Sequence, residues 1–234
     1  MTDTPPPMPP PPAAPGHEVY ASAKYRWLVG MALALTQAAV YFGIGHTEMQ
    51  RSTELLRLPV DDAIPFLPWT AWCYLPFYAG VFIMAIAGFR RRALFDRTAR
   101  SVLLVMFVGA LCHVFIRAEY PRPVLHPPFH GLSETFMAWV QGVDAPGNVF
   151  PSLHVAHTTM LALLLLRDRP VLGRVALAMA TMLALSTLTT KQHFLADVIS
   201  GYLLAFLGVH LALRGLPRRL TPEPVGRKRQ AETT

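Results

Sequence analysis

Long apolar runs constrain the fold of this chain more than any other feature. Stretches of roughly 18 or more residues carry almost no charge, and each is long enough to cross the ~30 Å hydrocarbon core of a bilayer as a helix. Charged residues make up 15% of the chain, against about 25% in soluble domains. The pattern predicts an all-α polytopic membrane protein with six transmembrane helices, at residues 27–44, 69–89, 102–116, 152–166, 175–189 and 194–213.

The apolar runs follow one another without an insert of domain size, so residues 23–215 should form one membrane domain that carries the catalytic groups. Residues 1–22 are rich in proline, which favours extended chain over helix, and we expect a disordered tail there. Residues 216–234 form a second, basic tail. Both tails should lie outside the membrane.

Lysine and arginine are distributed unequally between the two ends of the predicted helices. Most of the 21 basic residues fall on the face that carries both tails, and the other face receives Arg51, Arg57, Arg117, Arg122 and Lys191. Because cytoplasmic loops are the basic ones, both termini should be cytoplasmic, in the plasma (inner) membrane. The net charge of +7 then reflects topology and contact with anionic lipid, and we expect no nucleic-acid partner.

Two short polar stretches stand at the starts of predicted helices, residues 147–154 (GNVFPSLH) and 191–197 (KQHFLAD). Between His154 and His193 lie two apolar stretches, which is one crossing out and one crossing back. Both histidines should therefore reach the same membrane face. The charge distribution makes this the extracytoplasmic face.

These residues suit the transfer of a phosphoryl group without a metal. Such a reaction needs a nucleophile, an acid for the leaving oxygen and donors to the other phosphate oxygens. Asp197 lies four residues after His193, on the same helix face, where its carboxylate can accept one ring N–H and leave the other nitrogen as a nucleophile. Ser152 and the free N–H groups of its helical turn can bind phosphate, and His154 can protonate the leaving group.

The combination of Pro151-Ser152-Leu153-His154 with the segment HFLADVISG over 193–201 resembles the second and third signature motifs of the type 2 phosphatidic acid phosphatase superfamily. Six spans and an outward-facing site are also typical of its membrane branch. The resemblance covers roughly residues 100–205. It implies a cofactor-free reaction on a membrane lipid through a phosphohistidine on His193, with Asp197 orienting that ring and His154 acting as acid and then as base.

The chain departs from the family pattern at several positions. Arg122-Pro123 matches the end of the first motif (Lys-x6-Arg-Pro), but Phe115 occupies the lysine position, where Arg117 is a possible substitute. Thr187 replaces the arginine of the third motif, and Lys191 is a candidate to supply its charge. Leu153 replaces a usual glycine. The segments Phe-Pro-Ser-Leu-His and Lys-Gln-His are together similar to those of the inositol phosphorylceramide synthase-like group. In that group a lipid alcohol accepts the head group.

Other interpretations remain open at this point. His154 and His157 with His193 and Asp197 have spacings that also suit a metal ion. Alternatively, membrane histidine and aspartate residues serve as proton relays in transporters. Residues 131–143 predict an amphipathic helix lying across the interface as a lid or collar. We expect the acidic pair Asp61-Asp62 to be a solvated face without a catalytic role.

Overall fold

The computed structural model describes residues 19–45, 47, 51–144 and 146–214. Both predicted tails therefore lie almost wholly outside the described residues. The regular elements in the described part are helices, as expected. They are α1 (Ala23–Gly45), α2 (Pro59–Ala63), the 3-10 helix η1 (Pro68–Cys73), α3 (Leu75–Gly88), α4 (Arg92–Phe115), α5 (Leu132–Val143), α6 (Leu153–Asp168), α7 (Pro170–Thr189) and α8 (Leu195–Leu213).

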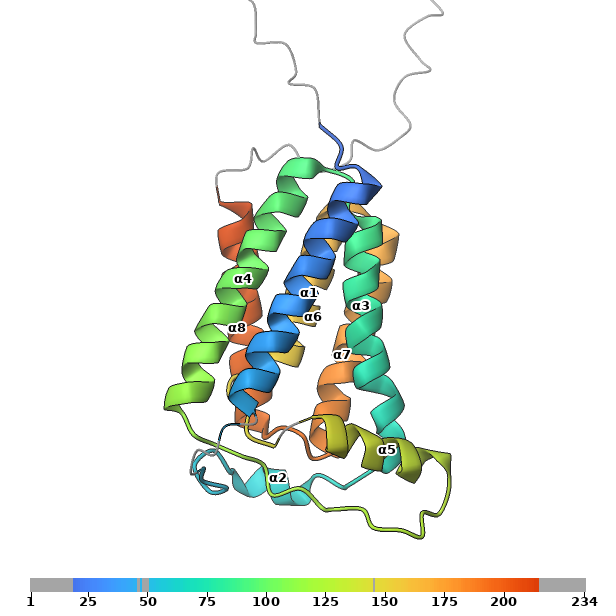
Figure 1. Ribbon diagram of the computed structural model, residues 1–234, viewed down its shortest axis with the longest axis vertical. Coiled ribbons are helices and arrows are strands. Elements are labelled where there is room, and N and C mark those ends of the chain that lie inside the picture. The colour runs from blue at the N-terminus through green and yellow to red at the C-terminus, as the bar shows by residue number, and fades with distance from the viewer. Residues whose placement is uncertain (1–18, 46, 48–50, 145, 215–234) are drawn as a thin grey trace, which may run out of the picture.

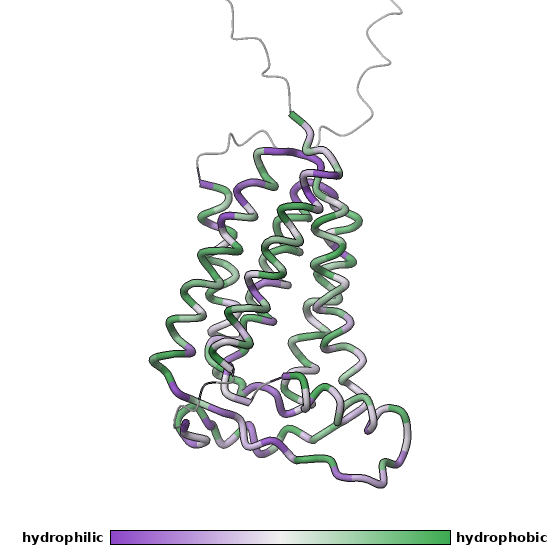
Figure 2. The backbone as a smooth tube through the Cα atoms, viewed as in Figure 1, coloured by the Kyte–Doolittle hydropathy of each residue, from purple (hydrophilic) through white to green (hydrophobic). Residues whose placement is uncertain are grey.

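Five of these segments are long and apolar enough to cross a membrane: α1, η1 with α3, α4, α7 and α8. The chain is thus a multi-pass membrane protein, and Figure 2 shows hydrophobic residues along the lengths of these helices. The remaining predicted span, residues 152–166, corresponds to α6, which has 16 residues and falls below that length. At 1.5 Å per residue it rises about 24 Å, less than the ~30 Å hydrocarbon core.

Helix α4 begins at Arg92, well before the predicted start at residue 102. Its first turns carry charged side chains, and Arg92 pairs with Asp96 at 3.0 Å, four residues along the same face. Such pairs support a helix beyond the end of its apolar part. The apolar run therefore marked the membrane-facing part of α4 and not the whole helix.

The long helices run roughly parallel in one bundle, with α6 at its centre (Figure 1). Helix α6 packs against α3, α4, α7 and α8, and its residues from Leu153 to Ala162 are buried. Helix α1 is peripheral: it packs on α3 and α4 and buries three residues, Gly30, Gln37 and Gly45. The helix that carries His154 is therefore held on most sides, whereas α1 covers one flank.

The two ends of the bundle differ. At the tail end, where α1 begins and α8 ends, Arg91 pairs with Asp168 at 3.0 Å and Arg97 donates to the Arg214 carbonyl (Figure 1). We call the opposite end, which carries α2 and α5, the histidine end.

Helix α5 lies across the histidine end, as expected for a collar (Figure 1). Its Met137 and Val140 are buried, and the Phe136 ring stacks on Trp72 of η1 with centroids 4.1 Å apart. Leu132, the first residue of α5, is exposed.

Candidate active site

Helix α6 begins after Ser152, whose Oγ accepts a hydrogen bond from the Val155 N–H at 3.4 Å. Serine is a favoured residue at this position because its oxygen satisfies a donor of the first turn. The Ser152 N–H donates to the Asp197 carbonyl at 3.1 Å, which joins the start of α6 to α8. Gly201 allows this approach, since a Cβ there would lie 2.7 Å from the Ser152 carbonyl oxygen. These contacts hold the first turn of α6, and with it His154, at a fixed position beside α8.

The second histidine is positioned by the end of α7. Lys191 adopts the left-handed conformation with φ +57°, and its N–H donates to the Leu188 carbonyl at 3.2 Å. The next N–H, of Gln192, donates to the Thr187 carbonyl at 2.9 Å, which completes a Schellman motif. The His193 N–H donates to the same carbonyl at 3.2 Å. The helix end thus fixes the backbone of His193 before α8 begins.

The two histidines meet at the histidine end of the bundle. Nε2 of His193 lies 3.5 Å from Nδ1 of His154, and the ring centroids are 5.7 Å apart. Both side chains are more than nine-tenths buried. The structure therefore brings together the two residues that the motifs predicted to act together.

Two oxygens lie near Nδ1 of His193. The Val149 carbonyl is 3.0 Å away and the nearer Asp197 carboxylate oxygen, Oδ2, is 3.4 Å away. The same Oδ2 accepts the Phe194 N–H at 2.8 Å, so Asp197 also stabilises the first turn of α8. Because both acceptors favour a proton on Nδ1, they leave Nε2 with a free lone pair on the side facing His154.

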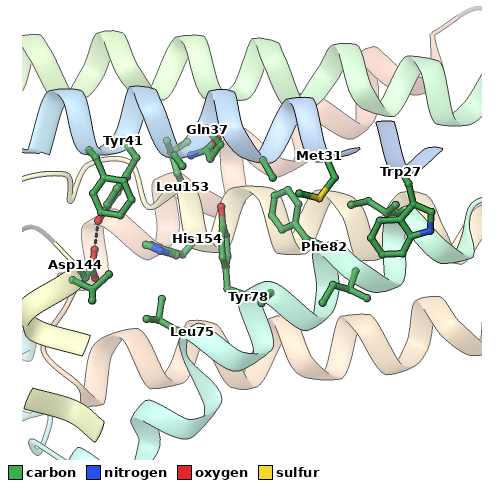
Figure 3. Close-up of a pocket in the computed structure, with 17 residues that line it drawn as sticks. Trp27, Met31, Gln37, Tyr41, Leu75, Tyr78, Phe82, Asp144, Leu153 and His154 are labelled. Atoms are coloured by element: carbon green, nitrogen blue, oxygen red, sulfur yellow. Dashed lines mark hydrogen bonds between the residues drawn. The ribbon is translucent and has the colours of Figure 1, made fainter. Parts of the chain in front are cut away.

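A second carboxylate, Asp144, stands behind His154. The Tyr74 hydroxyl donates to Asp144 Oδ2 at 2.7 Å and lies 3.1 Å from Nδ1 of His154. The Tyr41 hydroxyl also donates to Asp144 (Figure 3), and Arg122 donates to the Asp144 carbonyl and approaches Oδ2 at 3.7 Å. The residues of this polar cluster come from separate parts of the chain. Tyr41 lies on α1 and Tyr74 between η1 and α3, while Arg122 precedes α5 and Asp144 follows it.

The cluster keeps Asp144 charged. Burial alone would raise the pKa of its carboxyl, but Arg122, His154 and the two tyrosine hydroxyls outweigh burial and hold the pKa below its ordinary value. A negative charge beside His154 stabilises the protonated form of that ring. The charge of Asp144 therefore acts in favour of a proton on His154, against the effect of burial.

The model of the PAP2 superfamily matches residues 51–211. The chain belongs to the PAP2 superfamily. No curated protein and no solved structure matches the chain. Membership indicates a phosphatase or phosphotransferase that acts in the membrane on lipid. Helix α1 lies before the matched residues.

Three residues were predicted to bind the phosphate in this PAP2 protein. Ser152 is buried at the start of α6, where its oxygen serves as a helix cap. Arg122 lies in the Asp144 cluster, where Asp144 and Tyr74 stand between it and His154. The Lys191 ammonium donates to the Asp61 carbonyl at 2.8 Å. Burial lowers the pKa of Lys191, while Asp61 and Asp62 act in the opposite direction. Phosphate binding by these three side chains stays a prediction.

The interpretation of Asp61 as a solvated residue was wrong. It is 2% exposed, and its carboxylate accepts the N–H groups of Leu195 and Leu58, each at 2.8 Å. A carboxylate is stabilised at a helix N-terminus by the unpaired N–H groups and the helix dipole, and Leu195 begins α8. Asp62 is exposed as expected and pairs with Arg57 at 2.7 Å.

Only weak signals in the sequence point to the residues that the motifs missed. Asp144 precedes an apolar run, and a carboxylate near a membrane span is costly unless it is paired. Tyr74 and Tyr41 lie in apolar runs, where a tyrosine is ordinary. Within the described chain, no three His, Cys, Asp or Glu side chains form a group suited to a metal ion.

Proposed function

We propose that this PAP2 protein transfers a phosphoryl group from a membrane lipid through a phosphohistidine on His193. The observation that carries this proposal is the approach of His193 Nε2 to His154 Nδ1 at 3.5 Å, with an oxygen acceptor on the opposite nitrogen of His193. A nucleophile and an acid placed this close are suited to act on the two sides of one phosphorus–oxygen bond.

In the first step, the Nε2 lone pair of His193 attacks phosphorus and a P–N bond forms. The bond from phosphorus to the lipid oxygen breaks, and that oxygen takes a proton from His154. Asp197 and the Val149 carbonyl hold the Nδ1 proton of His193 and stabilise the charge that develops on its ring. The Asp144 carboxylate, through the Tyr74 hydroxyl, favours the protonated state of His154 before this step.

In the second step, an acceptor hydroxyl gives its proton to His154 and attacks phosphorus, and the P–N bond breaks. Water as acceptor makes the enzyme a phosphatase, and a lipid alcohol makes it a head-group transferase. The similarity of FPSLH and KQH to the inositol phosphorylceramide synthase-like group supports the transferase. Ser152, Arg122 and Lys191 are our candidates for binding the phosphate. Ser152 and Lys191 each lie two residues before one of the histidines, and Arg122 belongs to the Asp144 cluster.

The proposal includes an orientation in the membrane. Arginines gather at the tail end of the bundle, which favours cytoplasmic termini and an extracytoplasmic histidine site in the plasma membrane. Helix α6 would also cross the membrane, which brings the number of crossings to six. Its neighbours α3, α4, α7 and α8 surround it, so protein and not lipid meets most of its surface.

The test is incubation of the purified protein with lipid phosphates and phospholipids, with and without ceramide or diacylglycerol. Mass spectrometry should show free phosphate or a new phospholipid, and vanadate should inhibit because it mimics five-coordinate phosphorus. Activity that survives a chelator supports the histidine mechanism over a metal site. Failure to release or transfer phosphate from any of these lipids, together with solute transport that is lost in His193→Asn, would instead support a transporter.

A further inference from the structure

A cavity of about 370 Å³ lies between α1 and α3, and the reaction proposed above leaves most of it unused. It begins at His154 and Asp144 and extends along the two helices to Trp27 (Figure 3). Along α1, the distance from Tyr41 to Trp27 is 14 residues, or about 21 Å. One leaflet of a bilayer core is about 15 Å thick, so the cavity is long enough for one lipid chain.

The walls of the cavity are apolar and reach the surface of the bundle. Met31, Phe42 and Ile83 line it, and their side chains are 41–53% exposed. In a membrane, such a surface faces lipid, so a chain can enter sideways without leaving the apolar phase. The cavity reaches one member of the histidine pair, because His154 forms part of its wall.

One polar side chain inside the cavity points to a further contact. Gln37 is 9% exposed, and its carbonyl oxygen Oε1 is buried without a hydrogen-bond partner among the described residues. A buried amide oxygen left unpaired loses the hydrogen bonds that it makes to water, so a donor is expected there. Gln37 lies one helical turn, about 6 Å, from Tyr41, whose hydroxyl contacts Asp144. Gln37 therefore lies next to the polar end of the cavity, where the head group of a bound lipid would join its chain.

We propose that this cavity binds one alkyl chain of the lipid undergoing transfer, and that Gln37 accepts a hydrogen bond from a hydroxyl or amide N–H where the chain joins the head group. The inference rests on the proposed function and narrows its substrate class. It assigns lipid selectivity to α1, which lies before the residues that match the family. Trp27 closes the far end and sets the longest chain that fits.

The experiment compares two substrates in each variant: a long-chain lipid phosphate and p-nitrophenyl phosphate, which has no alkyl chain. Ala34→Phe places a ring inside the cavity, since Ala34 is part of its lining. The ratio of long-chain to p-nitrophenyl phosphate activity should fall at least tenfold. Ala39→Phe is the matched control, because Ala39 lies on the exposed side of α1, outside the cavity, and its ratio should stay at the wild-type value.

Gln37→Met tests the polar contact with little change in volume. For lipids that carry a hydroxyl or amide N–H beside the head group, KM should rise about three- to tenfold, as expected for one hydrogen bond. Lipids without that donor should show no such change. The p-nitrophenyl phosphate activity of each variant reports whether the catalytic end is still folded.

The outcomes separate the two proposals. If the wild type turns over p-nitrophenyl phosphate but Ala34→Phe lowers both activities equally or neither, the cavity does not hold the chain and the histidine mechanism stands. An equal rise in KM for both lipid types in Gln37→Met would overturn the assigned contact. If the wild type is inactive on every phosphate ester, the proposed function fails and this inference with it.

Discussion

Each of the two histidines has a carboxylate, but the two halves of the site are built differently. His193 receives its support locally: Asp197 lies four residues away on α8, and the Schellman motif of the preceding helix fixes its backbone. His154 receives its support from afar. Asp144 reaches it through Tyr74, which is 70 residues from Asp144 and 80 from His154 in the sequence.

The difference suits the roles that we propose for the two histidines. A nucleophile needs one defined tautomer and a fixed direction of attack, and nearby backbone groups supply both. An acid that later becomes a base must change charge, so it benefits from a carboxylate held at a distance that does not take its proton. Asp144 is held in that way, because the Tyr74 hydroxyl lies between its carboxylate and the ring of His154.

The largest expected effect separates the roles of the two histidines. His193→Ala should abolish both turnover and labelling by a phosphoryl donor, a loss on the order of 10⁴-fold or more, because the nucleophile is gone. His154→Ala should lower the turnover of lipid phosphates about 10²- to 10⁴-fold but still allow labelling by an activated ester, whose leaving group needs no proton. Radiolabelled donors and rapid quenching would measure both quantities.

His126→Ala is the matched control, because His126 lies in the loop before α5, exposed and far in sequence from both histidines. It should keep wild-type turnover. Full activity in His193→Ala would rule out the phosphohistidine on that residue. Loss of labelling by the activated ester in His154→Ala would show that His193 alone is not sufficient as the nucleophile and would contradict the assignment of roles.

Removing each carboxylate should affect turnover differently for substrates with poor leaving groups and for activated esters. Asp144→Asn removes the negative charge that favours protonated His154, so turnover of substrates with poor leaving groups should fall about a hundredfold while activated esters are spared. Asp197→Asn should slow both substrate types, since it acts on the nucleophile. The Val149 carbonyl remains as an acceptor for Nδ1 and should limit that loss to about a hundredfold.

Measurement of kcat against the pKa of the leaving group decides the comparison. Asp144→Asn should steepen this dependence, and Asp197→Asn should shift it downward without a change in slope. Equal slopes in both variants would mean that Asp144 serves folding alone.

A smaller effect is expected from the support beneath the nucleophile. Asp61→Asn should lower the free energy of unfolding by about 1–2 kcal/mol, because a buried carboxylate at the start of α8 is replaced by a neutral group. Asp62→Asn, one residue away and exposed, is the matched control and should leave the melting temperature unchanged. If both variants melt at the same temperature, the bond from Leu195 to Asp61 contributes nothing to the nucleophile half.

This contrast also explains how far the sequence could predict the molecule. Five of the six spans and the meeting of the two histidines could be predicted, because apolar length and short motifs are local properties of a chain. Asp197 was readable for the same reason. Asp144, Tyr74 and the burial of Asp61 depend on the packing of α5, α3 and α2 against the bundle end, and no residue spacing encodes those contacts.

The smallest expected effect concerns Lys191, whose left-handed backbone and charge can be separated. Lys191→Ala and Lys191→Gly both remove the ammonium that donates to the Asp61 carbonyl, but Ala keeps the strain of φ +57° and Gly does not. The Gly variant should therefore be more stable by about 1 kcal/mol, or about 2–4 °C in melting temperature. If Lys191 binds phosphate, both variants should raise KM by the same factor. A KM that rises in Ala alone would show that Lys191 acts by holding the backbone of His193 and not by its charge.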